Sequence, residues 1–587
     1  MSSKCTITRF LLALLVCVHT GLLSYCTYSF SPTANEPGQL TAGISHWRLQ
    51  RFDLYCITPP LGRLVAALPV IALTDDPQWQ EVSRNYRVKT HTYVGRDFVT
   101  TNGENFYSLL MLARLACIPF SVLGLIICFC WGRDMFGPND GLLAATFWCF
   151  DPNILAHGSL ITPDVAGTSL GCCACYNYGR WLRSPTWTQS LVAGGVLGFA
   201  VLSLFSLNVL IPLWLIMWVV GRVSDRATMR ITDWLREWAM LMACFYAVLY
   251  ILNIGYGFEG SMQRLNQFEF NSSLFTGKTT MEPGNRFRES WLGSIPMPVP
   301  SNYLAGIDQR RCDFEDYHRP SYLAGSWQKT GWWYYYYYAL AIKVPVGTSV
   351  LVFAAFLIRL FRARSVRFLD EVVLLVPPLA ILTVVSMQSG YSEDMRYVLP
   401  IFPYLFIWAS QMMPSVSRRQ GNSRISFVAR TMQVGSVASL LVWMTASSMS
   451  VYPHTLAYFN ELVGGPTQGH RFLLGSNIDW GQDLRHLKWY LDTNQKNNRC
   501  FLAYEGTVYP EDLGITYSIP QSAPNRQSTQ SLPSGVYAIS VTYLHGMPFI
   551  SRGKGDQAKT EILRFDGFLD RQPTAMCGYS IYVYVVD

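Results

Sequence analysis

The chain has 587 residues, of which 50% are hydrophobic and only 14% are charged. This is too little charge for the surface of an ordinary soluble protein. Apolar runs near the spanning length of ~20 residues recur along the chain, which indicates a multi-pass membrane protein. The net charge of +8 is concentrated in short arginine-bearing loops, so membrane topology and anionic lipids explain it better than nucleic-acid binding. We therefore expect membrane lipids, and no nucleic acid, among the partners.

The apolar segments predict about eleven transmembrane helices. They cover residues 9–30, 106–131, 141–155, 162–182, 191–220, 239–256, 344–358, 372–387, 397–413 and 428–449. Segment 191–220 has arginine on both sides, so we divide it into two short helices that turn near Ser206 and Asn208. The shorter apolar run 61–73 is interpreted as interfacial or re-entrant.

Clustered arginines fix the predicted orientation, because Lys/Arg excess in short loops marks the cytoplasmic side. The clusters are Arg180 and Arg183; Arg222, Arg226 and Arg230; Arg359, Arg362, Arg364 and Arg367; and Arg418, Arg419, Arg424 and Arg430. The outer loops 31–105 and 257–340 then face away from the cytoplasm, as do the turns that hold Asp151, Asp164 and Arg396. We expect the protein in the plasma (inner) membrane.

Composition changes at about residue 452, where charges and turn residues return and no further run is long enough to span. We predict a transmembrane domain over residues 1–451 and a C-terminal extracytoplasmic α/β domain over 452–587. The latter should contain a helix at 484–491 and strands at 535–544 and 579–586, which are rich in Val, Ile and Tyr. Cys500 and Cys577 could pair there. The fold class is thus mainly α, polytopic, with a small α/β domain.

Two outward carboxylates could do chemistry. Glu36 follows the first span directly, so it is held where a lipid headgroup would sit; it could equally be a solvated loop carboxylate. Asp164 begins a span, and a carboxylate at a helix start is also favourable without any function. Asp151 lies in the turn before it.

Two cations lie at the same level. Arg396, followed by Tyr397, opens a late span, and Lys343 precedes another. Each could reach phosphate headgroups without specificity. Arg396 could also bind one particular lipid phosphate through its planar donors. Single histidines such as His46 and His157 have no ligand partner at helical spacing, so we predict no metal site from them.

Taken in order, these outward elements resemble the GT-C superfamily of membrane glycosyltransferases, which includes protein O-mannosyltransferases and lipid A aminoarabinose transferases. The elements are Asn35-Glu36, Pro59-Pro60-Leu61, Asp164 and Arg396-Tyr397-Val398-Leu399-Pro400. A further string is similar to an uncharacterised bacterial branch of that superfamily, and it reads Asn477-Ile478-Asp479-Trp480-Gly481-Gln482-Asp483-Leu484.

The resemblance implies transfer of a sugar from a polyprenyl-phosphate donor to an envelope acceptor (a lipid, glycan or protein) outside the cytoplasm. Glu36 is then the first candidate for the base and Asp164 the second. The implied substrate-binding residues are Asn35, Arg396, Tyr397, Lys343 and Asp151. No organic cofactor is expected, although the carboxylates could hold a divalent cation.

The sequence departs from the family pattern at two positions. The family usually has Asp before the Glu, and its branch often has His three positions after the Glu, whereas this chain has Asn35 and Gln39. An amide cannot accept a proton near neutral pH. A catalytically inactive relative that binds polyprenyl lipid, or that scaffolds envelope partners, is therefore an alternative. A transporter or flippase is less favoured, because few acids or bases lie in mid-span.

Overall fold

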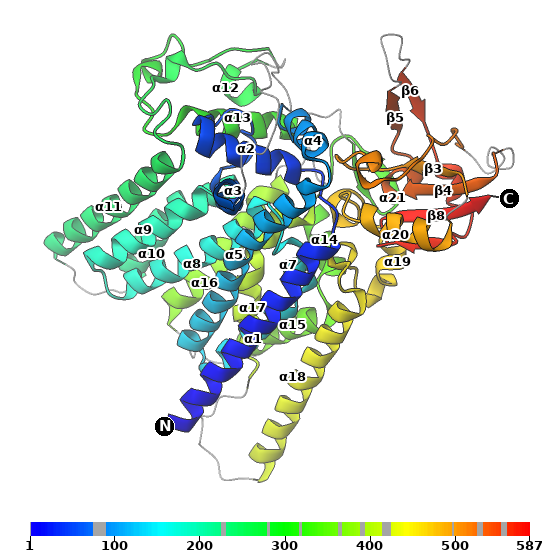
Figure 1. The fold of residues 1–587 in the computed structure, drawn as a ribbon. Coiled ribbons are helices and arrows are strands. Elements are labelled where there is room, and N and C mark those ends of the chain that lie inside the picture. The colour runs from blue at the N-terminus through cyan, green and yellow to red at the C-terminus, as the bar shows by residue number, and fades with distance from the viewer. Residues whose placement is uncertain are drawn as a thin grey trace.

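The computed structural model describes residues 2–73, 90–224, 230–278, 282–315, 320–361, 367–387, 394–413, 424–495, 498–524, 532–552 and 560–586. Long helices form a bundle, and a small strand-containing part lies at one end of it (Figure 1). This arrangement confirms the predicted fold class, a mainly helical multi-pass protein.

The first half of the chain supplies one part of the bundle. Its helices are α1 (Ser2–Ser29), α5 (Asn105–Met135), α6 (Pro138–Phe150), α8 (Pro163–Arg183), α9 (Trp187–Val201), α10 (Leu210–Ser224) and α11 (Ile231–Gly255). Between α9 and α10 the chain passes through a short 3-10 helix, Phe205–Val209. The predicted division of segment 191–220 into two helices near Ser206 and Asn208 is thereby confirmed.

The second half completes the bundle. Its helices are α14 (Tyr335–Lys343), α15 (Val346–Phe361), α16 (Phe368–Met387), α17 (Phe402–Ser410) and α18 (Arg424–Val451), with a 3-10 helix, Met395–Ile401, before α17. The chain bends by 115° between α14 and α15.

Six helices in the described part of the chain are long and apolar enough to cross a membrane, or up to seven if the bent α14–α15 pair forms one span. The six lie within α1, α5, α10 with the preceding 3-10 turn, α11, α16 and α18. The predicted number of about eleven also counts the shorter or more polar α6, α8, α9 and α17, and it stays a prediction.

The segments that were predicted to lie outside the cytoplasm gather at the end of the bundle where the strands lie (Figure 1). They form α2 (Glu36–Leu49), α3 (Leu61–Leu73), α4 (Thr90–Asn102), α7 (Pro152–His157), α12 (Ser273–Thr276), α13 (Ser301–Glu315) and the hairpin β1 (Ser321–Leu323) with β2 (Ser326–Gln328). The run 61–73, interpreted as interfacial or re-entrant, is a single helix that packs against α5 and α2.

Arginines that were expected to face the cytoplasm pair with acids from neighbouring helices. The N–O distances are 2.7 Å for Arg183–Asp370, 2.6 Å for Arg222–Glu237 and 2.7 Å for Arg359–Glu371. These contacts tie α8 and α15 to α16, and α10 to α11. Arg226, Arg362, Arg364, Arg418 and Arg419 lie outside the described residues.

A four-stranded sheet organises the C-terminal part. Its order is β3 (Cys500–Ala503), β4 (Gly535–Ser540), β8 (Ile581–Val586) and β7 (Ala575–Cys577), with β3 parallel to β4 and the other pairs antiparallel. Around it lie α19 (Pro466–Gly469), α20 (Leu484–Asn494), α21 (Val541–Leu544) and the hairpin β5 (Phe549–Arg552) with β6 (Thr560–Leu563). The helix expected at 484–491 is α20, and the strand expected at 579–586 is β8. The strand expected at 535–544 is confirmed only over β4, because residues 541–544 form α21.

The proposed pairing of Cys500 with Cys577 is wrong, because both thiols are free and buried. The two cysteines lie on the outermost strands of the sheet, β3 and β7, with β4 and β8 between them.

Candidate active site

A cavity of about 480 Å³ is lined by residues of α2, α8 and α13, among other segments. Four side chains selected from the sequence line it from three separate segments, and they are Asn35, Asp164, Arg396 and Tyr397. An apolar wall adjoins them, formed by Leu204, Phe205, Val209, Phe275, Val384 and Val385 among others. The cavity therefore combines a small polar region with a surface suited to hydrocarbon.

Asp164 is the acid among the described residues that line this cavity. It lies in the first turn of α8, after Pro163, a residue whose fixed φ favours the first helical position. The residue is 2% exposed, and its Oδ2 atom finds no hydrogen-bond partner among the described residues. Arg396 Nη1 lies 3.8 Å from that oxygen. Oδ2 is thus a buried acceptor that remains available to a ligand.

Arg396 is held rigidly. Its Nε and Nη2 atoms donate to Asp394 Oδ2 at 3.1 and 2.6 Å, and its guanidinium lies 4.1 Å from the centre of the Trp480 ring. Asp394 Oδ1 accepts in turn from Ser476 Oγ. Burial by itself raises the pKa of Asp394, but the Arg396 guanidinium and these hydrogen bonds outweigh it, so the pKa is lowered. The carboxylate stays charged and fixes the direction of Arg396.

Sequence reasoning missed a second cation, Arg310 of α13. Its guanidinium lies 4.7 Å from the centre of the Tyr397 ring, and that of Arg396 lies 5.4 Å from the same ring. Two guanidinium groups therefore lie next to one aromatic ring at the cavity. Because Arg310 belongs to no motif and follows a long polar loop, nothing in the sequence singled it out.

Glu36 does not line the cavity, and its carboxylate is fully engaged. It is completely buried and accepts from Arg114 Nε at 2.8 Å, from Arg114 Nη2 at 2.5 Å and from the backbone N–H of Thr33 and Ile161 at 2.8 and 3.1 Å. Burial raises its pKa, but Arg114 and these hydrogen bonds outweigh that effect and the pKa is lowered. These contacts suit a structural carboxylate better than a base.

Arg114 was also missed. It lies on α5, fully buried, and besides Glu36 it donates to the backbone carbonyls of Thr27, Phe30 and Ser31 at 2.9–3.1 Å. The pair thus anchors the end of α1 and the loop that follows it. This anchoring places Asn35 at the cavity. An arginine in an apolar segment requires a partner, and that signal could have identified Glu36 as the partner.

Lys343 and Asp151 are not among the described residues that line the cavity. Lys343 is 3% exposed, and its Nζ atom donates to the carbonyls of Leu456 and Asn477 at 2.8 and 2.6 Å. Asp151 caps α7, because its Oδ1 atom accepts from the backbone N–H of Asn153 at 2.9 Å. The structure therefore does not bring these two residues together with Asp164 and Arg396.

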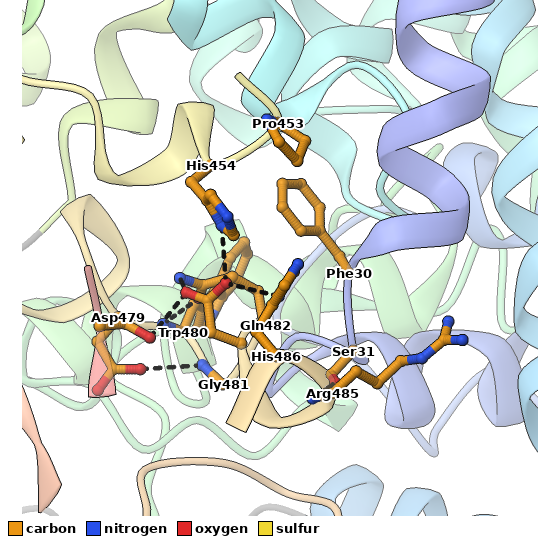
Figure 2. Close-up of polar contacts among 12 residues, drawn as sticks. Phe30, Ser31, Pro453, His454, Asp479, Trp480, Gly481, Gln482, Arg485 and His486 are labelled. Atoms are coloured by element: carbon orange, nitrogen blue, oxygen red, sulfur yellow. Dashed lines mark hydrogen bonds and ion pairs between the residues drawn. The ribbon is translucent and has the colours of Figure 1, made fainter. Parts of the chain in front are cut away.

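Residues 477–484, the string singled out in the sequence, contact and support residues of the site. The backbone N–H of Ser31 donates to the Gln482 carbonyl at 2.8 Å, and that of Ala34 donates to the Trp480 carbonyl at 2.9 Å. Trp480 also covers Arg396, and Figure 2 shows the string lying beside the loop that follows α1. The string therefore positions both the first outer loop and the cation of the site.

Comparison with solved structures gives remote likenesses. ArnT from Cupriavidus metallidurans bound to undecaprenyl phosphate is 12% identical, with 97% of each chain covered and a TM-score of 0.45. Its apo state is 13% identical, covering 99% of this chain and 98% of that chain, with a TM-score of 0.46. The apo oligosaccharyltransferase from Archaeoglobus fulgidus is 11% identical, covering 92% and 70%, with a TM-score of 0.45. At this level of similarity, neither the ligand nor the reaction of these proteins can be assigned to this chain.

No significant match is found among the curated proteins. Residues 106–251 match the model of a protein family described as dolichyl-phosphate-mannose-protein mannosyltransferase. The matched segment includes most of α5 and continues into α11, so it contains Asp164. The match covers about a quarter of the chain, and it agrees with the resemblance to membrane glycosyltransferases that the motifs indicated.

Proposed function

We propose that this protein transfers a sugar from a polyprenyl-phosphate donor to an acceptor on the extracytoplasmic side of the membrane. The observation that carries the proposal is the shared cavity: an available carboxylate oxygen of Asp164 lies 3.8 Å from Arg396 Nη1, and Arg310 lies beside the same tyrosine ring as Arg396. The apolar wall would accommodate the first part of a polyprenyl chain. The family match over residues 106–251 supports the reaction class.

Each group then has a defined role in the reaction. The acceptor hydroxyl attacks the anomeric carbon of the sugar, and Asp164 Oδ2 removes the hydroxyl proton. The bond between the anomeric carbon and the phosphate oxygen breaks, so the polyprenyl phosphate leaves with an additional negative charge. Arg396 and Arg310 stabilise that charge, as fixed cations do best in a water-poor site. A positioned base contributes ~10²–10⁴-fold to such a rate.

The role of Glu36 changes in this proposal. Because its oxygens are engaged by Arg114 and by backbone N–H groups, we assign it to positioning the first outer loop. Asn35, which that loop brings to the cavity, would hydrogen-bond to the donor or acceptor without taking a proton. Lys343 and Asp151 would act through the packing of α14 and α7.

A second candidate function rests on Asn35. The position where the family usually has an acid faces the cavity as an amide. The cavity could then bind polyprenyl phosphate without turnover, in a protein that scaffolds envelope partners.

Donor turnover separates the two candidates. The full-length protein in lipid nanodiscs would be incubated with a panel of undecaprenyl-phosphate hexoses, and released undecaprenyl phosphate would be measured by mass spectrometry. Release is expected with at least one donor, and Asp164→Asn should reduce it by ~10²-fold or more. Asp53→Asn is the matched control, because the Asp53 side chain is 51% exposed and Asp53 is not among the described residues that line the cavity. An unchanged rate in Asp164→Asn would refute the assignment, and binding without release from any donor would favour the inactive relative.

A further inference from the structure

Two histidines and an aspartate meet where the bundle joins the C-terminal part (Figure 2). His454 follows α18, whereas Asp483 and His486 lie at the start of α20. The Nδ1 atom of His454 lies 3.1 Å from Asp483 Oδ1, and the Nδ1 atom of His486 lies 3.3 Å from the same oxygen. One donor atom from each residue lies within 4.8 Å of the other two. The sequence singled out neither histidine, and it marked Asp483 only as a member of the string 477–484.

These distances match the edges of a metal tetrahedron. With zinc–nitrogen and zinc–oxygen bonds of about 2.0–2.2 Å, neighbouring donor atoms lie about 3.3–3.5 Å apart. Two of the three edges already have nearly this length. Two imidazoles and one carboxylate form a donor set that suits zinc and other divalent transition metals, and one that Mg²⁺ or Ca²⁺ rarely uses.

The carboxylate is oriented as a ligand would be. Asp483 is fully buried, and its Oδ2 atom accepts from Gln482 Nε2 at 2.6 Å and from Ser580 Oγ at 2.8 Å. These two hydrogen bonds leave Oδ1 directed at the histidines. Gly578 has a φ of +61°, and a Cβ added there would lie 1.9 Å from Asp483 Oδ1, so only glycine lets this turn close on the carboxylate. Such supporting contacts are typical of the second shell of a metal site.

The histidines also leave an opening. Their side chains are 21% and 28% exposed for His454 and His486, so an ion can enter and a water molecule can complete the tetrahedron. His486 Nδ1 is buried and has no hydrogen-bond partner among the described residues, although it faces Asp483 Oδ1. A buried polar atom without a partner is unfavourable, and a metal ion bound between the three residues would satisfy it.

We propose that His454, Asp483 and His486 bind one zinc ion, or a divalent transition metal of similar preference, at the junction of α18 with α20. The site lies outside the described lining of the cavity, so its role would be structural. Asp483 belongs to the string whose Trp480 covers Arg396 and whose backbone holds Ser31. A metal at this point would therefore fix the string against the end of α18 and keep Trp480 on Arg396. The proposal does not depend on the sugar-transfer reaction.

The test uses full-length protein carrying a tag without histidine, because a polyhistidine tag would itself bind zinc. The protein is stripped with a chelator, exchanged into metal-free detergent buffer and titrated with ZnCl₂ by calorimetry, and bound metal is counted by mass spectrometry. One zinc per chain is expected, with a rise in the thermal midpoint when it binds. The affinity should fall by more than ~100-fold in His454→Ala and His486→Ala, and by ~10–100-fold in Ser580→Ala, which removes only a supporting hydrogen bond.

Two controls keep the outcome decisive. His545→Ala removes one member of a second histidine pair, whose His470 Nδ1–His545 Nε2 distance is 2.6 Å, and should leave the zinc stoichiometry unchanged. If the histidine variants do not fold, cobalt(II) bound to the wild-type protein should show the visible absorption of a tetrahedral site. Absence of stoichiometric zinc, retention of zinc by both histidine variants, or an octahedral cobalt spectrum would overturn the proposal and leave a metal-free hydrogen-bonded cluster.

Discussion

Replacing Glu36 distinguishes a structural carboxylate from a catalytic one. In Glu36→Ala the Arg114 guanidinium would remain buried and charged without its partner, at a cost of about 3–5 kcal/mol in the free energy of unfolding. The backbone N–H groups of Thr33 and Ile161 would also lose their acceptor. Glu36→Gln retains one acceptor oxygen, but its amide NH₂ group would face donors of Arg114 or of the backbone. This variant should therefore destabilise the protein as well. Thermal unfolding followed by tryptophan fluorescence measures the change.

Substitution of Asp164 should affect stability and turnover differently from substitution of Glu36. Asp164→Asn should reduce donor turnover while leaving the thermal midpoint nearly unchanged, because Oδ2 of Asp164 has no hydrogen-bond partner to lose among the described residues. The double variant Glu36→Leu/Arg114→Leu should recover part of the lost stability, since it removes both charges. The recovery of stability should be incomplete, because Arg114 also donates hydrogen bonds to three backbone carbonyls. A Glu36→Gln protein with a native midpoint and no turnover would refute the reasoning and restore Glu36 as the base.

Arg310→Ala should weaken binding of undecaprenyl phosphate by ~10–100-fold, since a hydrogen bond to a charged group contributes ~1.5–3 kcal/mol; exposed Arg288→Ala is the control, and equal affinities would contradict it. Trp480→Leu should slow turnover by up to ~30-fold through loss of ~2 kcal/mol of cation–π contact with Arg396, with an unchanged rate as the contrary result. Burial raises the pKa of Asp479 well above its usual value, and the negative charge of Glu505 raises it further. The folded state therefore binds that proton more tightly than the unfolded state, and stability declines as pH rises above about 4. Asp479→Asn should raise the thermal midpoint at pH 8 more than at pH 5, and equal gains at both pH values would refute the sign.

Much of the architecture was predictable because it follows from the membrane. Arginine on both sides of segment 191–220 required an even number of crossings, and the break at Phe205–Val209 agrees with that requirement. Asp164, Arg396 and Tyr397 belong to the outward motifs that the sequence displays, and all three line one cavity. These features depend on hydropathy and charge, which a sequence displays directly.

The remaining features depend on contacts between distant segments. Glu36 has an outward position in the sequence, but its pairing with Arg114, 78 residues later, decides its role. Arg310 reaches the cavity only because α13 folds back across it, and no pattern marks that turn. The His454 site joins residues about 30 positions apart, although the spacing of Asp483 and His486, three residues apart on a helix start, gives a partial signal.

The position of the bound lipid phosphate tests the proposed reaction most directly. A cryo-electron microscopy structure of the full-length protein in nanodiscs with undecaprenyl phosphate would test this position. The phosphate should lie between Arg310 and Arg396, within hydrogen-bond reach of both, with the hydrocarbon chain along Leu204, Phe205 and Val385. Density for the phosphate outside this cavity, with Asp164 and Arg396 facing only protein, would contradict the account.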